Sequence, residues 1–118
     1  MTAFSTRVVG QALDVGRLAD PTPYAHPVNY APCHDLAEDV RRQEGAIIRF
    51  PSVRDKGGVN VAVLNCSAFQ GGIGPTQGWW FRFAERGLFA AERFGEGRLE
   101  FPFEMFADDP RITLVALG

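Results

Sequence analysis

AIIRFPSVRDKGGVNVAVL, residues 46–64, is the stretch that decides the fold. Its first five residues form a short apolar run, and its last six alternate in a way that is typical of a β-strand. The pair Gly57 and Gly58 is a strong turn signal, because glycine adopts turn conformations without a steric penalty. The stretch therefore predicts a β-hairpin whose loop carries Ser52, Arg54 and Asp55.

A helix is expected directly before this hairpin, over residues 32–44. Leu36 and Val40 recur at helical spacing. Acidic side chains come early in the segment and basic ones late, which matches the helix macrodipole. Proline is tolerated in a first helical turn and glycine often follows a last one, so Pro32 and Gly45 mark the limits of this helix.

Further strands are expected on both sides of the helix and hairpin. Apolar or alternating segments of this kind are typical of strands, and they lie at residues 7–13, 79–83, 88–94, 98–103 and 112–117. The proline-rich segment 21–32 is expected to be an ordered loop. Together these elements predict an α+β fold, with a mixed, mostly antiparallel sheet and one main helix, in a single domain over residues 1–118.

Composition limits the classes of function. The 118 residues are 46% hydrophobic and 22% charged, as in ordinary globular proteins, and the net charge of −2 gives no electrostatic footprint for nucleic acid. No apolar run approaches the roughly 20 residues that span a bilayer. Cys33 and Cys66 are too few for a disulfide framework, and no signal segment precedes them. We therefore expect a cytoplasmic protein that contacts neither membrane nor nucleic acid directly.

The loop after residue 50 is the first candidate site. Arginine suits a diphosphate because its planar fork bonds two oxygens at once, and serine suits a ribose hydroxyl. Loops held on rigid strands often carry binding groups. The competing interpretation is an ordinary hairpin turn, in which Arg54 and Asp55 form a solvated ion pair and Ser52 is a local cap.

Two other groups of residues are weaker candidates. Cys33 and His34, taken with His26 or Cys66, match no standard ligand spacing, so no metal site is expected. Cys33 and His34 are also poorly suited to act as nucleophile and base, because adjacent side chains rarely align for proton transfer. The aromatic run at residues 79–83 offers surfaces for stacking on a ring, although such runs more often form the core of a sheet.

Several short motifs occur in an order that resembles the C-terminal half of the RES domain family. They are the helix DLAEDVR (35–41), Gly45, the strand IIRF (47–50), the loop PSVRD (51–55), the glycine pair 57–58 and the strand NVAVL (60–64). Asp14-Val15 resembles the end of a family strand, and Gln77-Gly78-Trp79 a segment that some members carry. The resemblance covers about residues 7–69 well and residues 70–118 loosely.

The resemblance implies a fold similar to part of the ADP-ribosyltransferase-like RES fold, and toxins of RES/Xre-type toxin–antitoxin systems. Family members degrade NAD by hydrolysis or phosphorolysis of the nicotinamide–ribose bond. Ser52 matches the family's catalytic serine, and Ser52, Arg54 and Asp55 would bind NAD as substrate, without a bound cofactor. An Xre-type antitoxin and a second copy of the chain are the partners to expect.

The family's arginine and glutamate have no counterpart in this sequence. They belong upstream of the matched motifs, and Arg7, Arg17 and Glu38 fall at the wrong places in the motif order. Cleavage of the nicotinamide bond develops oxocarbenium character that a carboxylate stabilises, and Ser52 cannot do this alone. We therefore expect a truncated or divergent RES-type toxin domain. The alternative is a non-catalytic module that binds a nucleotide or a partner protein.

Overall fold

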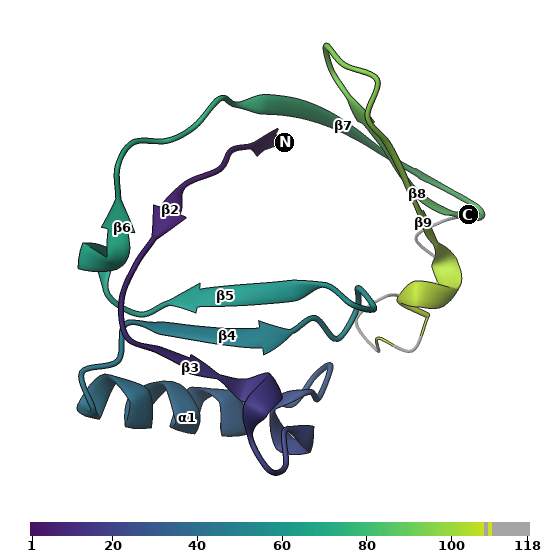
Figure 1. The fold of residues 1–118 in the computed structure, drawn as a ribbon. Helices are drawn as coiled ribbons and strands as arrows, with labels where there is room; N and C mark the ends of the chain where they lie inside the picture. The colour runs from purple at the N-terminus through teal and green to yellow at the C-terminus, as the bar shows by residue number, and fades with distance from the viewer. Residues whose placement is uncertain (108, 110–118) are drawn as a thin grey trace. The chain divides into compact units, whose positions relative to one another are not determined.

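The computed structural model describes residues 1–107 and 109, and the strand expected at 112–117 lies outside them. The chain divides into two compact units, residues 7–71 and residues 1–6 with 72–118. One main helix and mostly antiparallel sheets make the described chain α+β, which confirms the predicted class (Figure 1). Whether the whole chain acts as a single domain stays a prediction.

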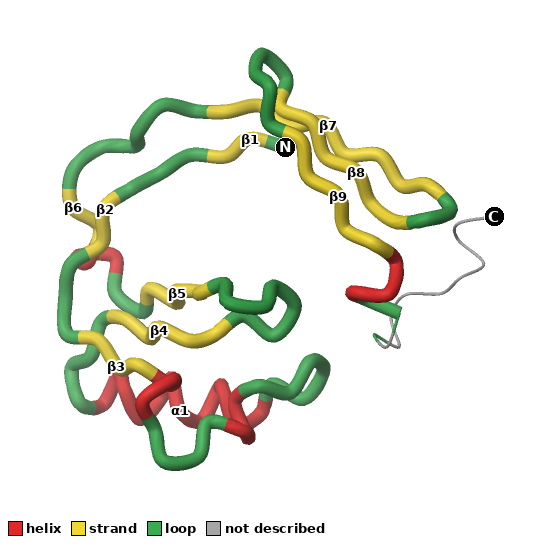
Figure 2. The backbone as a smooth tube through the Cα atoms, turned by 45° about the vertical axis from the view of Figure 1, so that its right-hand side comes forward, coloured by secondary structure: helices red, strands yellow, loops and turns green. Residues whose placement is uncertain are grey.

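Residues 7–71 contain a three-stranded sheet with one helix against it (Figure 2). Its strands, in the order β3-β4-β5, are β3 (Ala12–Asp14), β4 (Ile47–Pro51) and β5 (Val59–Val63). β4 and β5 form the predicted antiparallel hairpin, whereas β3 runs parallel to β4. Val15, Val40 and Ile48 are buried between the sheet and helix α1 (Ala31–Arg42), and this cluster is the core of the unit.

Helix α1 begins one residue before the predicted start and ends two residues before the predicted end. At its end the N–H of Glu44 donates to the carbonyl of Arg41, and that of Gly45 to the carbonyl of Val40. This is the pattern of a Schellman motif. The left-handed residue is Glu44, with a φ of 60°, rather than the predicted glycine. Gly45 is needed for space, because a Cβ there would lie 2.4 Å from Cγ1 of Val40.

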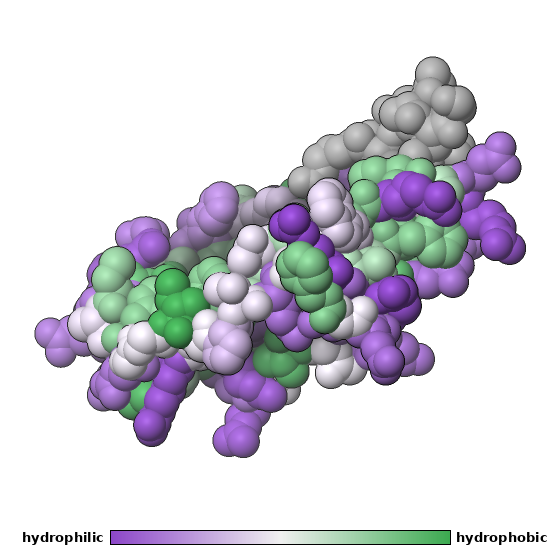
Figure 3. Space-filling view, turned by 90° about the horizontal axis from the view of Figure 1, so that it is seen from above, coloured by the Kyte–Doolittle hydropathy of each residue, from purple (hydrophilic) through white to green (hydrophobic). Residues whose placement is uncertain are grey.

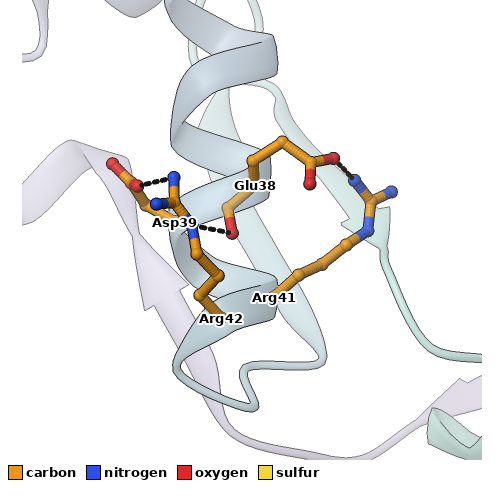
Figure 4. Close-up of polar contacts among 4 residues, drawn as sticks. All are labelled: Glu38, Asp39, Arg41 and Arg42. Atoms are coloured by element: carbon orange, nitrogen blue, oxygen red, sulfur yellow. Dashed lines mark hydrogen bonds and ion pairs between the residues drawn. The ribbon is translucent and has the colours of Figure 1, made fainter.

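The exposed side of α1 is held by ion pairs one turn apart (Figure 4). Arg41 pairs with Glu38, and Arg42 pairs with Asp39 and also donates to the carbonyl of Glu38. Exposed pairs of this kind stabilise a helix only slightly. These four charged residues therefore form a solvated surface of the helix.

The strand predicted at residues 7–13 is two strands in two different sheets. β2 (Arg7–Val8) pairs antiparallel with β6 (Phe69–Gln70), and β3 starts only at Ala12. Between them the backbone passes close to Ala46, because a Cβ on Gly10 would lie 2.9 Å from the Cβ of Ala46. The prediction of one continuous strand is wrong because the chain changes partner at this glycine.

Short 3-10 helices make up the turns of this unit. They are η1 (Val15–Arg17), η2 (Thr22–Tyr24) and η3 (Cys66–Ala68). The side chains of Asp14 and Asn65 cap η1 and η3 by accepting a backbone N–H two residues ahead. The proline-rich segment is thus an ordered connection, as predicted, and it leads from β3 to α1.

The other unit is an antiparallel sheet in the order β1-β7-β8-β9. Its strands are β1 (Thr2–Ala3), β7 (Gln77–Ala84), β8 (Gly87–Glu92) and β9 (Arg98–Pro102), followed by η4 (Phe103–Met105). β7 and β8 form the second predicted hairpin. The aromatic run in β7 does not form a core as expected, because Trp80, Phe81 and Phe83 are 63%, 42% and 64% exposed.

Apolar and hydrophilic side chains mix on the face of the molecule that is seen in Figure 3. Among the described residues, no helix has the length and apolar character needed to cross a membrane.

Candidate functional site

The loop between β4 and β5 is closed by its own backbone. The N–H of Ser52 donates to the carbonyl of Gly58 at 2.9 Å, and the N–H of Gly58 donates to the carbonyl of Asp55 at 2.8 Å. Gly57 takes a φ of 86°, which glycine adopts easily. The Ser52 hydroxyl accepts the N–H of Asp55 at 3.1 Å, so it caps the turn while its own proton remains for another acceptor.

Arg54 connects this loop to the segment before helix α1. Its Nη2 atom donates to the carbonyl of Pro27 at 3.4 Å, and the hydroxyl of Tyr30 donates to the same carbonyl at 2.9 Å. The imidazole of His26 turns back on its own segment, where Nδ1 accepts the N–H groups of Val28 at 3.1 Å and Asn29 at 2.7 Å. The β4–β5 loop and the segment before α1 thus meet at the carbonyl group of Pro27.

A cavity of about 360 Å³ lies between these two segments, and we call it the outer cavity. Its size falls in the range of roughly 300–1,000 Å³ that is usual for small-molecule sites. Its walls come from the segment before α1, the start of α1, the β4–β5 hairpin and its loop. The lining residues are Tyr24, His26, Pro27, Tyr30, Cys33, His34, Phe50, Ser52, Val53, Arg54 and Asn60.

The described residues that line the outer cavity include no carboxylate. Arg54 contributes a fixed positive charge, and Ser52, Tyr30 and Asn60 contribute hydroxyl and amide groups. Because Nδ1 of His26 accepts two hydrogen bonds, the proton of the neutral ring lies on Nε2. The cavity therefore combines hydrogen-bond donors with aromatic walls, an arrangement suited to an anionic ligand that carries a ring.

The structure brings together two of the three predicted site residues. Ser52 and Arg54 line the outer cavity, but Asp55 is not among its lining residues. The Asp55 carboxylate lies over the loop backbone instead, because a Cβ on Gly58 would come 2.3 Å from its Oδ2 atom. Whether any of the three residues binds a ligand stays a prediction, and the local cap proposed for Ser52 is present as well.

Tyr24 and Tyr30 are lining residues that the sequence did not single out, and His26 was considered only as a metal ligand. They lie in the proline-rich segment, which has no periodic pattern to place its side chains. One signal was available, because the four prolines of this segment point to a fixed conformation.

Asp14 joins β3 to β4 from outside the outer cavity. Its carboxylate accepts Nη1 of Arg49 at 2.7 Å and the N–H of Gly16 at 3.0 Å, and Nε of Arg17 lies 3.7 Å away. Desolvation alone would raise the pKa of this carboxyl. The hydrogen bonds and the positive charges of Arg49 and Arg17 outweigh desolvation, so the pKa of Asp14 lies below its usual value. The residue that matched a family strand end therefore holds two strands together.

The weaker candidates form no comparable site among the residues that the structure describes. Within residues 1–107 and 109, no three His, Cys, Asp or Glu side chains cluster in a way that could bind a metal ion. Cys33 and Cys66 are free thiols. Arg93 follows directly after β8, and its guanidinium lies 5.5 Å from the ring centre of Trp80 in β7, an arrangement that is cation–π in character.

Fold and cavity together define an α+β protein in which residues 7–71 carry a cavity between the β4–β5 loop and the segment before α1. The family model described as RES domain matches residues 1–84, well over half of the chain, so the chain belongs to the RES domain family. Searches of curated proteins and of solved structures found no match. The family resemblance of the residues around Ser52 is thus confirmed.

Proposed function

We propose that this chain binds the ADP-ribose part of NAD in the outer cavity, as the ligand-binding part of an NAD-degrading RES domain. The observation that carries the proposal is that Ser52 and Arg54 line one cavity together. Both positions lie in the loop that carries the family resemblance. The cavity's donors and aromatic walls also suit a phosphorylated nucleoside better than a cationic ligand.

Each lining residue has a role in this proposal. Arg54 faces the diphosphate, where a hydrogen bond to a charged group contributes about 1.5–3 kcal/mol. Ser52 donates its hydroxyl proton to the nicotinamide ribose, a neutral bond that contributes about 0.5–1.5 kcal/mol. Asp55 acts indirectly, because its N–H orients the Ser52 oxygen and its carbonyl shapes the turn.

The same proposal extends to the toxin–antitoxin system in which such a domain acts. Such a domain acts as a toxin in the cytoplasm, because it removes nicotinamide from NAD and so degrades the NAD pool. An Xre-type antitoxin restrains its activity. Water as the nucleophile gives hydrolysis, and phosphate gives phosphorolysis. Both reactions need stabilisation of an oxocarbenium-like transition state, which a carboxylate usually provides.

A second function, binding without catalysis, is also favoured by the structure of the cavity, because no carboxylate lines the outer cavity within the described residues. The chain would then bind a nucleotide or a partner protein without cleaving NAD. Nicotinamide release separates the two functions, because binding alone leaves NAD intact.

Calorimetric titration of ADP-ribose tests the binding proposal. Arg54→Ala is expected to weaken binding by roughly tenfold or more, and Ser52→Ala by less, because about 1.4 kcal/mol corresponds to a factor of ten. The matched controls are Arg42→Ala on the exposed helix surface and Ser67→Ala in η3, which should bind like the parent. Equal affinities in all five proteins, or no binding to the parent, would reduce the loop to an ordinary hairpin turn.

Nicotinamide release from NAD, measured with and without phosphate, tests catalysis. We expect the 118-residue chain to release little, because no carboxylate lines the described part of the cavity. Rapid release would contradict this and require a substitute acid. Glu38, Glu44 and Glu104 would then be changed to glutamine one at a time, with Glu85→Gln as the control.

A further inference from the structure

A second, smaller cavity lies behind the outer cavity, and we call it the inner cavity. It has a volume of about 220 Å³ and lies where helix α1 covers the β3–β5 sheet. The two cavities share Tyr24, Cys33, His34 and Phe50, so they adjoin at a common wall. The inner cavity is completed by Val15, Leu36, Ala37, Ile48 and Ala62.

The lining of the inner cavity is mostly apolar, and its polar side-chain groups come from Tyr24, Cys33 and His34. None of the described residues around it is an aspartate, glutamate, lysine or arginine. Of its polar groups, the thiol of Cys33 is directed at the carbonyl of Tyr24, 3.6 Å away. A cation placed here would lose its hydration and find no counter-charge. The aromatic faces of Tyr24 and Phe50 would offset only part of that loss.

The inner cavity is partly open to solvent and borders the core of this unit. It touches Val15 and Ile48, two of the three buried residues of the core cluster. Apolar surface in contact with water is unfavourable, because its burial lowers the free energy. A ligand that fills the cavity removes this apolar surface from water, so the cavity is suited to an apolar guest.

We propose that the inner cavity binds the uncharged planar ring of a nucleotide whose ribose and phosphate groups occupy the outer cavity. This inference rests on the proposed function. Tyr24 and Phe50 stand at the shared wall, where flat aromatic side chains stack well on a flat ring. Adenine is such a ring, and so is free nicotinamide. The nicotinamide ring of intact NAD is positively charged and is excluded.

The charge of the ring therefore decides which end of the dinucleotide enters the inner cavity. Adenosine monophosphate and nicotinamide mononucleotide each carry a ribose phosphate, but the ring is neutral in the first and cationic in the second. Titrated into the parent protein, adenosine monophosphate is expected to bind at least tenfold more tightly. Equal affinities, or tighter binding of nicotinamide mononucleotide, overturn the inference. Free nicotinamide is titrated separately, and it reports whether the released neutral ring is also accepted.

Two substitutions fill the inner cavity without touching the outer one. Ala62→Leu on β5 and Ala37→Leu on α1 each add a branched apolar side chain to its wall. Each variant is expected to lose at least tenfold in affinity for adenosine monophosphate and to melt at a higher temperature than the parent. Ala12→Leu on β3, which lines neither cavity, is the control and should leave this affinity unchanged.

The outcomes separate this inference from the proposed function. If ADP-ribose binds but neither ring charge nor the two leucine variants changes the affinity, the inference is overturned and the proposed function stands. If ADP-ribose and both mononucleotides fail to bind, the proposed function is overturned together with the inference. Should a leucine variant fail to fold, the comparison of the two mononucleotides on the parent still decides the matter.

Discussion

At the scale of single residues, the charge of Asp14 is linked to stability through its contacts with Arg49 and Gly16. Its pKa is lowered in the folded chain, so its stabilising effect is present above the unfolded value of about 3.9 and is lost as pH falls through the folded pKa. We expect the melting temperature of the parent to fall on acidification from about pH 5 towards pH 3. Asp14→Asn should melt lower at pH 7, because it loses the ion pair with Arg49.

The difference between the two proteins should shrink as the medium becomes acid. Asp39→Asn, which removes an exposed pair on α1, is the control and should follow the parent's pH curve. Parallel curves for the parent and Asp14→Asn would show that the contacts of this carboxylate do not contribute to folding.

A short motif was enough to place Ser52 and Arg54 in one loop between two recognisable strands, and both line the outer cavity. Tyr24 and Tyr30 were not singled out, because their place in the cavity depends on how an irregular segment folds back on itself. Asp55 was assigned to the site as part of the loop motif PSVRD, and its carboxylate lies towards Gly58. Whether any of the three loop residues binds a ligand stays a prediction.

At the scale of elements, the end of helix α1 stores a small strain. Glu44 has a φ of 60°, a conformation that costs a residue with a side chain about 1–2 kcal/mol. Glu44→Gly should remove that strain and stabilise the chain by roughly 0.5–1 kcal/mol, after allowance for the greater freedom of glycine when unfolded. Urea denaturation of both proteins measures the difference in free energy of unfolding.

Gln43→Gly is the matched control one residue earlier. Gln43 has a φ of −92°, so glycine relieves nothing there and should destabilise the chain by about 0.5–1 kcal/mol. If both glycine variants were destabilised equally, the left-handed turn at Glu44 would carry no strain.

Element prediction succeeded where local pattern and tertiary partner agreed. Both hairpins and the helix were expected close to where they lie, because turn residues and periodicity mark them directly. The prediction of one strand over residues 7–13 failed because the sequence of a strand does not show which other strand it pairs with. Gly10 was the available signal, since glycine inside a strand often marks a close approach of the backbone.

On the scale of the whole molecule, one sheet leaves an apolar face exposed. Register places Phe81 beside Ala90 and Leu99, and Phe83 beside Leu88, on the same face of the β7–β9 sheet. Phe83 is 64% and Leu99 is 50% exposed. Exposed apolar patches promote association. We therefore expect a dimer or higher oligomer at micromolar concentration, measured by light scattering.

The combination of Phe83→Ser and Leu99→Ser should shift that equilibrium towards monomer. Trp80→Ser changes an exposed aromatic residue on the opposite face of the same sheet and should leave association unchanged. A parent that is monomeric at all concentrations, and melts cooperatively, would mean that this face needs no partner.

The sequence predicted the class of the molecule, and whether its two compact units act as the single expected domain stays a prediction. The pairing of Thr2 with Gly78 places the first residues of the chain in the same unit as residues 72–118. Contacts so distant along the chain leave no local pattern, because they depend on the assembled sheets. The predicted hairpin, the helix and the outer cavity all belong to the unit of residues 7–71, and the family model matches residues 1–84.

The parallel pairing of β3 with β4 also determines the order in which this unit can fold. Formation of the β4–β5 hairpin closes only the short loop of residues 52–58. Pairing of β3 with β4 must close a much longer loop, which consists of residues 15–46. Long loop closures lose more chain entropy and slow the formation of native contacts. The outer cavity takes walls from both the hairpin and the long connection, so it is completed only after that second closure. A ligand in this cavity consequently acts on a late folding step: it slows the departure from the native state and leaves the initial collapse unchanged.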